Sequence, residues 1–135
     1  MQRIVVGYDG SEESKRALER ATSLGRSGAS VTIVAAVEVG SHGPRNMGAL
    51  NDDELRAERE VLDAARTNLK AEGLEVHTVE GEGSPHEVLI EAAKEVDADL
   101  IIVGTRGRGG VKRALMGSTS TKVVQHAPCD VLVVR

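Results

Sequence analysis

The chain contains no tryptophan and no phenylalanine, and Tyr8 is its only tyrosine. Valine, isoleucine, leucine and alanine must therefore fill the interior, which favours a valine-rich sheet covered by alanine- and leucine-rich helices. The single cysteine, Cys129, excludes an internal disulfide. Because Cys129 lies between Pro128 and a valine-rich run, we interpret it as a small buried hydrophobe rather than a reactive thiol.

Targeting and membrane signals are also lacking. No apolar run approaches the roughly 18 residues of a membrane span, and the amino terminus shows no basic segment followed by a long hydrophobic stretch. We expect an unprocessed cytoplasmic protein without membrane contact. The net charge of -4 argues against a nucleic-acid binder, which normally carries a basic face. The length of 135 residues fits one domain, residues 1–135.

Apolar runs of strand type alternate with amphipathic helical segments along the chain. Strict alternation predicts right-handed crossovers and the α/β class. We expect a single doubly wound, mainly parallel five-stranded sheet, Rossmann-like, in strand order 3-2-1-4-5 with helices on both faces. The predicted strands are residues 3–8, 31–37, 75–79, 99–105 and 131–134, and the later helices are residues 53–71, 85–96 and 118–126.

Helix ends are marked by particular residues. Gly28 is predicted to end the first helix and Gly73 the second. Ser84 is predicted to cap the third helix, with Glu87 completing a capping box. Residues 40–53 are rich in glycine and polar side chains, and we expect them to form either a mobile connection or a lid.

The predicted fold points to one place for a site. Open parallel sheets bind ligands outside the carboxyl ends of their strands, where the strand order reverses. Asp9 follows the first strand at that edge. It can contact a ligand or cap the next helix, although Ser11 is an equally good cap. Asp97 and Asp99 precede the fourth strand, so we place them at the opposite end of the sheet, roughly 15–20 Å away.

A glycine-rich, cationic stretch follows the fourth strand. Residues 100–129 contain no Asp or Glu, and the basic residues there are Arg106, Arg108, Lys112, Arg113 and Lys122. Gly104, Gly107 and Gly117 would leave room for a ligand, and Ser118 opens a helix whose free amides favour an anion such as phosphate. The alternative is that the glycines serve turns and the basic residues form a solvated face. The spacing matches neither the Walker motif nor the dinucleotide motif.

No catalytic group and no metal site is expected. The four histidines have no spacing that brings metal ligands together. Ser118 and His126 lie in one predicted helix about 12 Å apart along its axis, so they cannot form a nucleophile and base pair.

The order Gly104-x2-Gly107-x9-Gly117-Ser118 resembles the ATP-binding universal stress proteins. The segments IVVGYDGSEES, DADLIIVGTRGRGG and APCDVLVVR extend the resemblance over essentially the whole chain, although Asp130 stands where proline is frequent in that family. The resemblance implies ATP with Mg²⁺ as the ligand. It implies a nucleotide site made of Tyr8, Asp9, Val37, Val103, Gly104, Arg106, Gly107, Gly117, Ser118, Thr119 and Ser120.

The resemblance also implies a homodimer formed through the last strand, whose residues are Val131, Leu132, Val133 and Val134. An exposed apolar strand edge gives an independent reason to expect pairing with a second copy. We therefore expect an ATP-binding regulatory stress-response module with slow or no hydrolysis and an unassigned protein partner. The alternatives are a weak ATPase or self-phosphorylating phosphotransferase, with charge stabilisation by Arg106, Lys112 or Arg113, and a dimeric interaction module with an empty pocket.

Overall fold

The computed structural model describes residues 2–37, 51–105 and 116–135. Its sheet has five parallel strands in the order β3-β2-β1-β4-β5, as the sequence predicts. The strands are β1 (Arg3–Gly7), β2 (Ser30–Val37), β3 (Glu75–Glu82), β4 (Leu100–Gly104) and β5 (Asp130–Val134). The helices are α1 (Glu12–Leu24), α2 (Asp52–Ala71), α3 (Pro85–Val96) and α4 (Ser118–His126).

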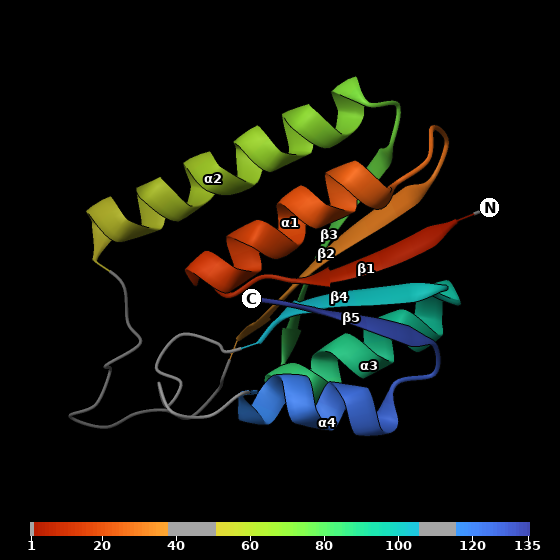
Figure 1. Cartoon of the computed structure of the whole chain (residues 1–135). Helices are drawn as coiled ribbons and strands as arrows, with labels where there is room; N and C mark the ends of the chain where they lie inside the picture. Colours follow the sequence, from red (N-terminus) through yellow and green to blue (C-terminus); the bar gives the residue numbers. More distant parts are fainter. Residues whose placement is uncertain (1, 38–50, 106–115) are drawn as a thin grey trace.

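The sheet is covered on both faces. Figure 1 shows α1 and α2 on one face and α3 and α4 on the other. Ile4 and Val6 of β1 pack in the core on the α1 side, whereas Val5 packs in the core on the α3 side. Neighbouring side chains of the strand therefore lie on opposite faces of the sheet. All three are fully buried. None of the described helices is long and apolar enough to cross a membrane.

The end of α1 differs from the prediction. The helix ends at Leu24 with Gly25 as its C-cap, not at Gly28, and the Gly25 N–H donates to the Ala21 carbonyl at 2.9 Å. A Cβ on Gly25 would lie 2.8 Å from the side chain of Leu74, so close packing requires glycine at this point. Gly28 instead occupies a later turn with φ of 87°.

The start and end of α2 are well defined by hydrogen bonds. Asn51 accepts from the Glu54 N–H at 2.8 Å, and the Glu54 carboxylate accepts from the Asn51 N–H at 3.2 Å, which completes a capping box. The last residues of the predicted connection 40–53 thus belong to the helix, and residues 38–50 lie outside the described part. Gly73 ends α2 as predicted, because Gly73 and Leu74 donate to the carbonyls of Lys70 and Leu69 in a Schellman motif.

Two further expectations about ends need correction. β3 continues to Glu82 rather than stopping at residue 79, because it stays paired with β2 as far as Val37. Ser84 stands at the N-cap of α3, but its side chain makes no capping hydrogen bond. Its buried Oγ has no hydrogen-bond partner among the described residues.

Gly104 sets the distance between β4 and α1. A Cβ at this position would lie 2.6 Å from Glu13 Cβ and 3.0 Å from the Glu13 carbonyl carbon. These atoms belong to the first turn of α1, so the helix start packs directly on the end of β4. The absence of a side chain at residue 104 is therefore a packing requirement.

We predict that Gly104→Ala lowers the free energy of unfolding by about 1–3 kcal/mol, because the added methyl group forces α1 away from β4. Denaturant unfolding measures the change. The double variant Gly104→Ala with Glu13→Gly should recover part of the loss, because it removes the nearest atom. Strictly additive effects of the two substitutions would contradict this account.

The two N-caps make a matched pair for a second prediction. Asn51→Ala should lower the free energy of unfolding by about 1 kcal/mol, because it removes the capping hydrogen bond of α2. Ser84→Ala should change it by less than about 0.5 kcal/mol, because no cap bond is lost. Equal losses in the two variants, measured by urea titration, would show that the caps are equivalent.

Candidate functional site

A pocket lies at the carboxyl ends of β1 and β4. The chain leaves these neighbouring central strands toward opposite edges of the sheet, so the pocket stands where the strand order reverses. Its empty space, counted together with the adjoining open solvent, is about 510 Å³. The lining residues are Gly7, Tyr8, Asp9, Ser11, Ser14, Val34, Ala36, Pro85, Leu89, Val103, Gly104, Thr119 and Ser120.

One wall of the pocket is apolar. Val34, Leu89 and Val103 come from β2, α3 and β4, and all three are buried. Gly7 lies among them, where a Cβ would approach the Leu89 methyl groups at 3.1–3.2 Å and Val103 Cγ1 at 3.3 Å. Because Gly7 has no side chain, the backbone of β1 faces this wall directly. The arrangement can accept a flat apolar group.

A second wall is the turn from β1 into α1. Ser11 caps α1 by accepting from the Ser14 N–H at 3.2 Å, and Gly10 makes the turn possible with φ of 85°. Asp9 therefore does not serve as the cap. Its carboxylate accepts from the Ser11 N–H at 2.9 Å, and Asp9 is exposed at the pocket. The turn thus holds the Asp9 carboxylate at the edge of the pocket, beyond the last residue of β1.

The third wall is the start of α4, which is tied to the end of β4. The Gly117 N–H and the Ser120 hydroxyl both donate to the Thr105 carbonyl, the latter at 2.8 Å. Ser120 Oγ also lies 3.1 Å from the Gly117 carbonyl. Its proton is thus used within the protein, while Thr119 lines the pocket. No acidic residue occupies the first turn of α4, so no carboxylate of that turn neutralises the positive end of the helix dipole.

The structure brings most of the predicted residues together. Gly117 and Ser118 begin α4 beside the pocket, with Ser118 exposed. Val37 ends β2, but its side chain is not described, and Arg106 and Gly107 lie outside the described residues. Six predicted residues line the pocket, namely Tyr8, Asp9, Val103, Gly104, Thr119 and Ser120.

Gly104 lines the pocket for a reason other than the one expected from the sequence. The prediction was that its missing side chain leaves room for a ligand, whereas the structure shows that a Cβ there would meet Glu13 of α1. Sequence reasoning also missed residues that contribute through their position alone. The sequence signal that could have identified them is their position near the carboxyl ends of β1 and β2 or in the first turns of α1 and α3. They are Gly7, Ser11, Ser14, Val34, Ala36, Pro85 and Leu89.

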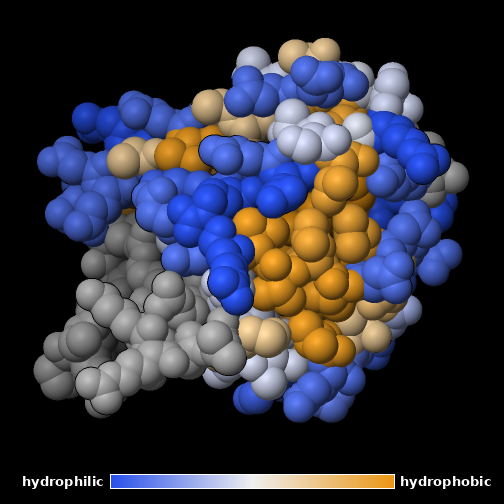
Figure 2. Space-filling view, viewed as in Figure 1, coloured by the Kyte–Doolittle hydropathy of each residue, from blue (hydrophilic) through white to orange (hydrophobic). Residues whose placement is uncertain are grey.

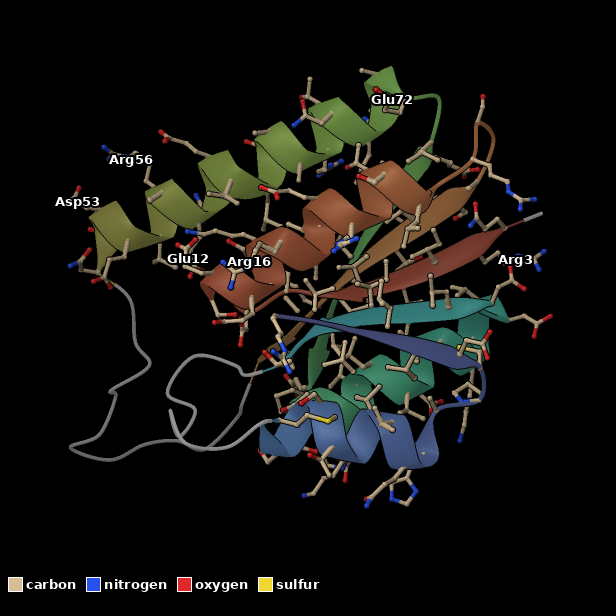
Figure 3. The ribbon with its side chains drawn as sticks, in the orientation of Figure 1. Arg3, Glu12, Arg16, Asp53, Arg56 and Glu72 are labelled. Atoms are coloured by element: carbon tan, nitrogen blue, oxygen red, sulfur yellow. The ribbon has the colours of Figure 1, made fainter. Side chains whose placement is uncertain are left out.

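The residues excluded from the site lie elsewhere, as expected. The Asp99 carboxylate accepts from the Arg3 N–H at 2.8 Å at the amino end of the sheet. Figure 3 shows Arg3 at one end of the molecule and Glu12 and Arg16, at the start of α1, at the other. Cys129 is partly buried against the core, and burial raises the pKa of its thiol, with smaller contributions from Asp130 and Asp99. This environment favours the protonated thiol.

Comparison with known proteins places the chain in a family. A sequence model of the universal stress protein family matches residues 1–135. A Staphylococcus aureus strain USA300 protein that bears the universal stress protein name is 33% identical over 139 residues, which cover 99% of this chain and 84% of that protein.

Solved structures agree with this assignment. UspA from Lactobacillus plantarum superposes with a TM-score of 0.80 at 24% identity, covering 99% of this chain and 97% of that one. A universal stress protein solved in complex with cAMP gives 0.72 at 33% identity, with coverage of 99% and 97%. The Archaeoglobus fulgidus protein in complex with dAMP gives 0.65 at 24% identity, with coverage of 100% and 98%. The chain belongs to the universal stress protein family.

Proposed function

We propose that this chain is a regulatory module that binds an adenine nucleotide, ATP with Mg²⁺, in the pocket between β1 and β4. One observation carries the proposal: an apolar wall and the start of α4, whose first turn has no acidic residue, border the same pocket. The wall suits a purine base, and the helix start suits phosphates. Relatives solved with cAMP and dAMP support an adenine nucleotide as the ligand.

The arrangement of the walls suggests how a nucleotide would lie. The base would enter between Val34, Leu89 and Val103, and the ribose would lie near Asp9 and Gly104 at the strand ends. The phosphates would then reach the amides of Ser118 and Thr119. Arg106 and Gly107 belong to the proposed phosphate site on the strength of the glycine motif alone.

Mg²⁺ fits this site only as part of the nucleotide. The described residues contain no group of three or more His, Cys, Asp or Glu side chains that could hold a metal ion. Asp9 is the one carboxylate among the described lining residues. A magnesium ion commonly takes one or two protein carboxylates and completes its coordination with phosphates and water. Asp9 would therefore contact an ion that the triphosphate brings.

We propose that turnover of the nucleotide is slow or absent. Of the described residues that line the pocket, only Tyr8 and Asp9 are titratable. Efficient phosphoryl transfer requires a group that positions or deprotonates the attacking nucleophile. The Asp9 carboxylate is already engaged with the Ser11 N–H. This lining supports binding and a change of state rather than catalysis.

We also propose that the chain forms a homodimer through β5. β5 is an edge strand, and its side chains Val131, Leu132 and Val133 are only partly buried. Figure 2 shows a broad apolar surface over β5 that reaches toward α4. Val124 on α4 is 50% exposed. An apolar surface next to an unpaired strand edge favours pairing with a second copy.

A charge at the start of α4 tests the nucleotide site. Gly117→Asp should weaken binding of ATP with Mg²⁺ at least tenfold in calorimetry, because the carboxylate repels the phosphates. Aspartate is a good N-cap, so the fold should not suffer. The matched variant Gly117→Asn, which is neutral, should retain most of the affinity. Equal affinities of the Asp and Asn variants would remove the α4 start from the site.

An exposed charge in the apolar surface tests the dimer. Val124→Glu should shift the protein toward monomer in sedimentation equilibrium, raising the dimer dissociation constant about tenfold or more, because the charge would be buried at the interface. Leu55→Glu on α2, where the native side chain is 42% exposed, is the control and should leave the dimer intact. A monomeric unaltered protein, or a fully dimeric Val124→Glu variant, would contradict the proposed interface.

A further inference from the structure

A groove lies at the edge of the sheet opposite β5, between β3 and α3. Its empty space, counted together with the adjoining open solvent, is about 830 Å³. Its floor is apolar, formed by Val79, Val88 and Ala92. At one end α3 presses on the strand, since a Cβ on Gly81 would lie 2.5 Å from Val88 Cγ1. Three carboxylates of α3 border the groove, namely Glu87, Glu91 and Glu95. Glu80 and Glu82 of β3 also line it, but their side chains alternate onto the opposite face of the sheet, where their neighbour Val76 packs.

The strand beside the groove has an unpaired edge. β3 is the outermost strand and pairs only with β2 within the described sheet. The Glu75 N–H donates to the Ala29 carbonyl at 2.8 Å, toward β2. Parallel strands alternate the direction of their backbone groups, so the N–H and C=O groups of Thr78 and Glu80 point outward. β3 contains neither lysine nor proline, the usual protection of an exposed edge.

The charge of the groove is not balanced nearby. Among the described residues, no ion pair reaches Glu80, Glu82, Glu91 or Glu95. The weak contact at 3.9 Å between Glu87 and His86 is the one pairing at the border. A second copy of β3 would bring carboxylates against carboxylates, which disfavours pairing between two such edges. A basic segment would remove this repulsion.

The spacing of the carboxylates matches an extended chain. Glu87, Glu91 and Glu95 follow one another at intervals of four residues on α3, which is about 6 Å along the helix axis. Alternate residues of a β-strand are separated by about 6.6 Å on one face. A strand added to β3 would therefore present every second side chain to successive carboxylates. Its remaining side chains would point to the other face of the sheet.

We propose that the β3 edge and the α3 groove bind an extended segment of a partner protein in which every second residue is lysine or arginine. The segment adds to the sheet as a further strand, so main-chain hydrogen bonds to the outward groups of β3 provide affinity. Glu87, Glu91 and Glu95 select basic residues at alternate positions. The groove is separate from the nucleotide pocket, and the two sets of lining residues have no member in common.

Two peptides of equal composition test the proposal. The first is an octapeptide with blocked ends that alternates lysine with threonine or valine, and the second has its lysines in one block. Measured by calorimetry at physiological salt without nucleotide, the alternating peptide should bind at least tenfold more tightly. Hydrogen exchange should show added protection at Thr78 and Glu80 amides. Equal affinities, or protection elsewhere only, would overturn the proposal.

Variants of the chain separate the contribution of the carboxylates to peptide binding from the contribution of the main-chain hydrogen bonds. Glu91→Gln combined with Glu95→Gln should weaken the alternating peptide on the order of tenfold. Glu60→Gln combined with Glu72→Gln, on α2 and its end (Figure 3), removes the same two charges outside the groove and should bind as the unaltered protein does. Thr78→Pro removes an outward N–H without breaking the ladder to β2, so the fold should remain while binding is lost.

Three outcomes would count against this site. Equal weakening by the Glu60 and Glu72 double variant would indicate attraction to net charge alone. Unchanged binding to the Glu91 and Glu95 double variant would remove α3 from the site. Self-association that protects the β3 amides in the absence of peptide would assign the edge to a second copy of the chain.

Discussion

The hydrogen bonds of Thr105 hold the carboxyl end of the sheet together. Its N–H donates to the Val134 carbonyl of β5 at 2.7 Å, and its carbonyl accepts from the Gly117 N–H and from the Ser120 hydroxyl at 2.8 Å. Thr105 and Ser120 are both buried, where an unpaired polar group would be costly. The backbone groups of this one residue thus fix the start of α4 relative to both β4 and β5. The pocket exists because these elements keep that position.

Much of the fold could be predicted from the sequence because the apolar pattern follows the layers. Val5 and Ile101 lie in central strands covered on both faces, and such strands appear as continuous apolar runs. The ends of elements were harder to predict. Helix α1 ends at Gly25 rather than Gly28, and the close approach of Leu74, remote in sequence, to Gly25 is visible only in the structure. The run 75–79 gave no sign that β3 would follow β2 for three more residues.

The candidate site was predicted in part, for a similar reason. The rule for parallel sheets locates Asp9 and the start of α4 at one edge without any knowledge of contacts. It does not reveal which side chains of neighbouring elements complete the pocket, such as Leu89 from α3 and Val34 from β2. Those depend on how the helices pack across the sheet. The role of Gly104 was misjudged because only the packed structure shows that α1 lies against it.

The two edges of the sheet differ in chemistry: β5 is apolar, whereas β3 carries Glu75, Glu80 and Glu82. If β5 of one molecule paired edge to edge with β3 of the next, copies could add without limit and form a fibre. That contact would strip water from the carboxylates without giving them a partner. The mismatch between the two edges therefore acts against open-ended polymerisation of the chain through its sheet.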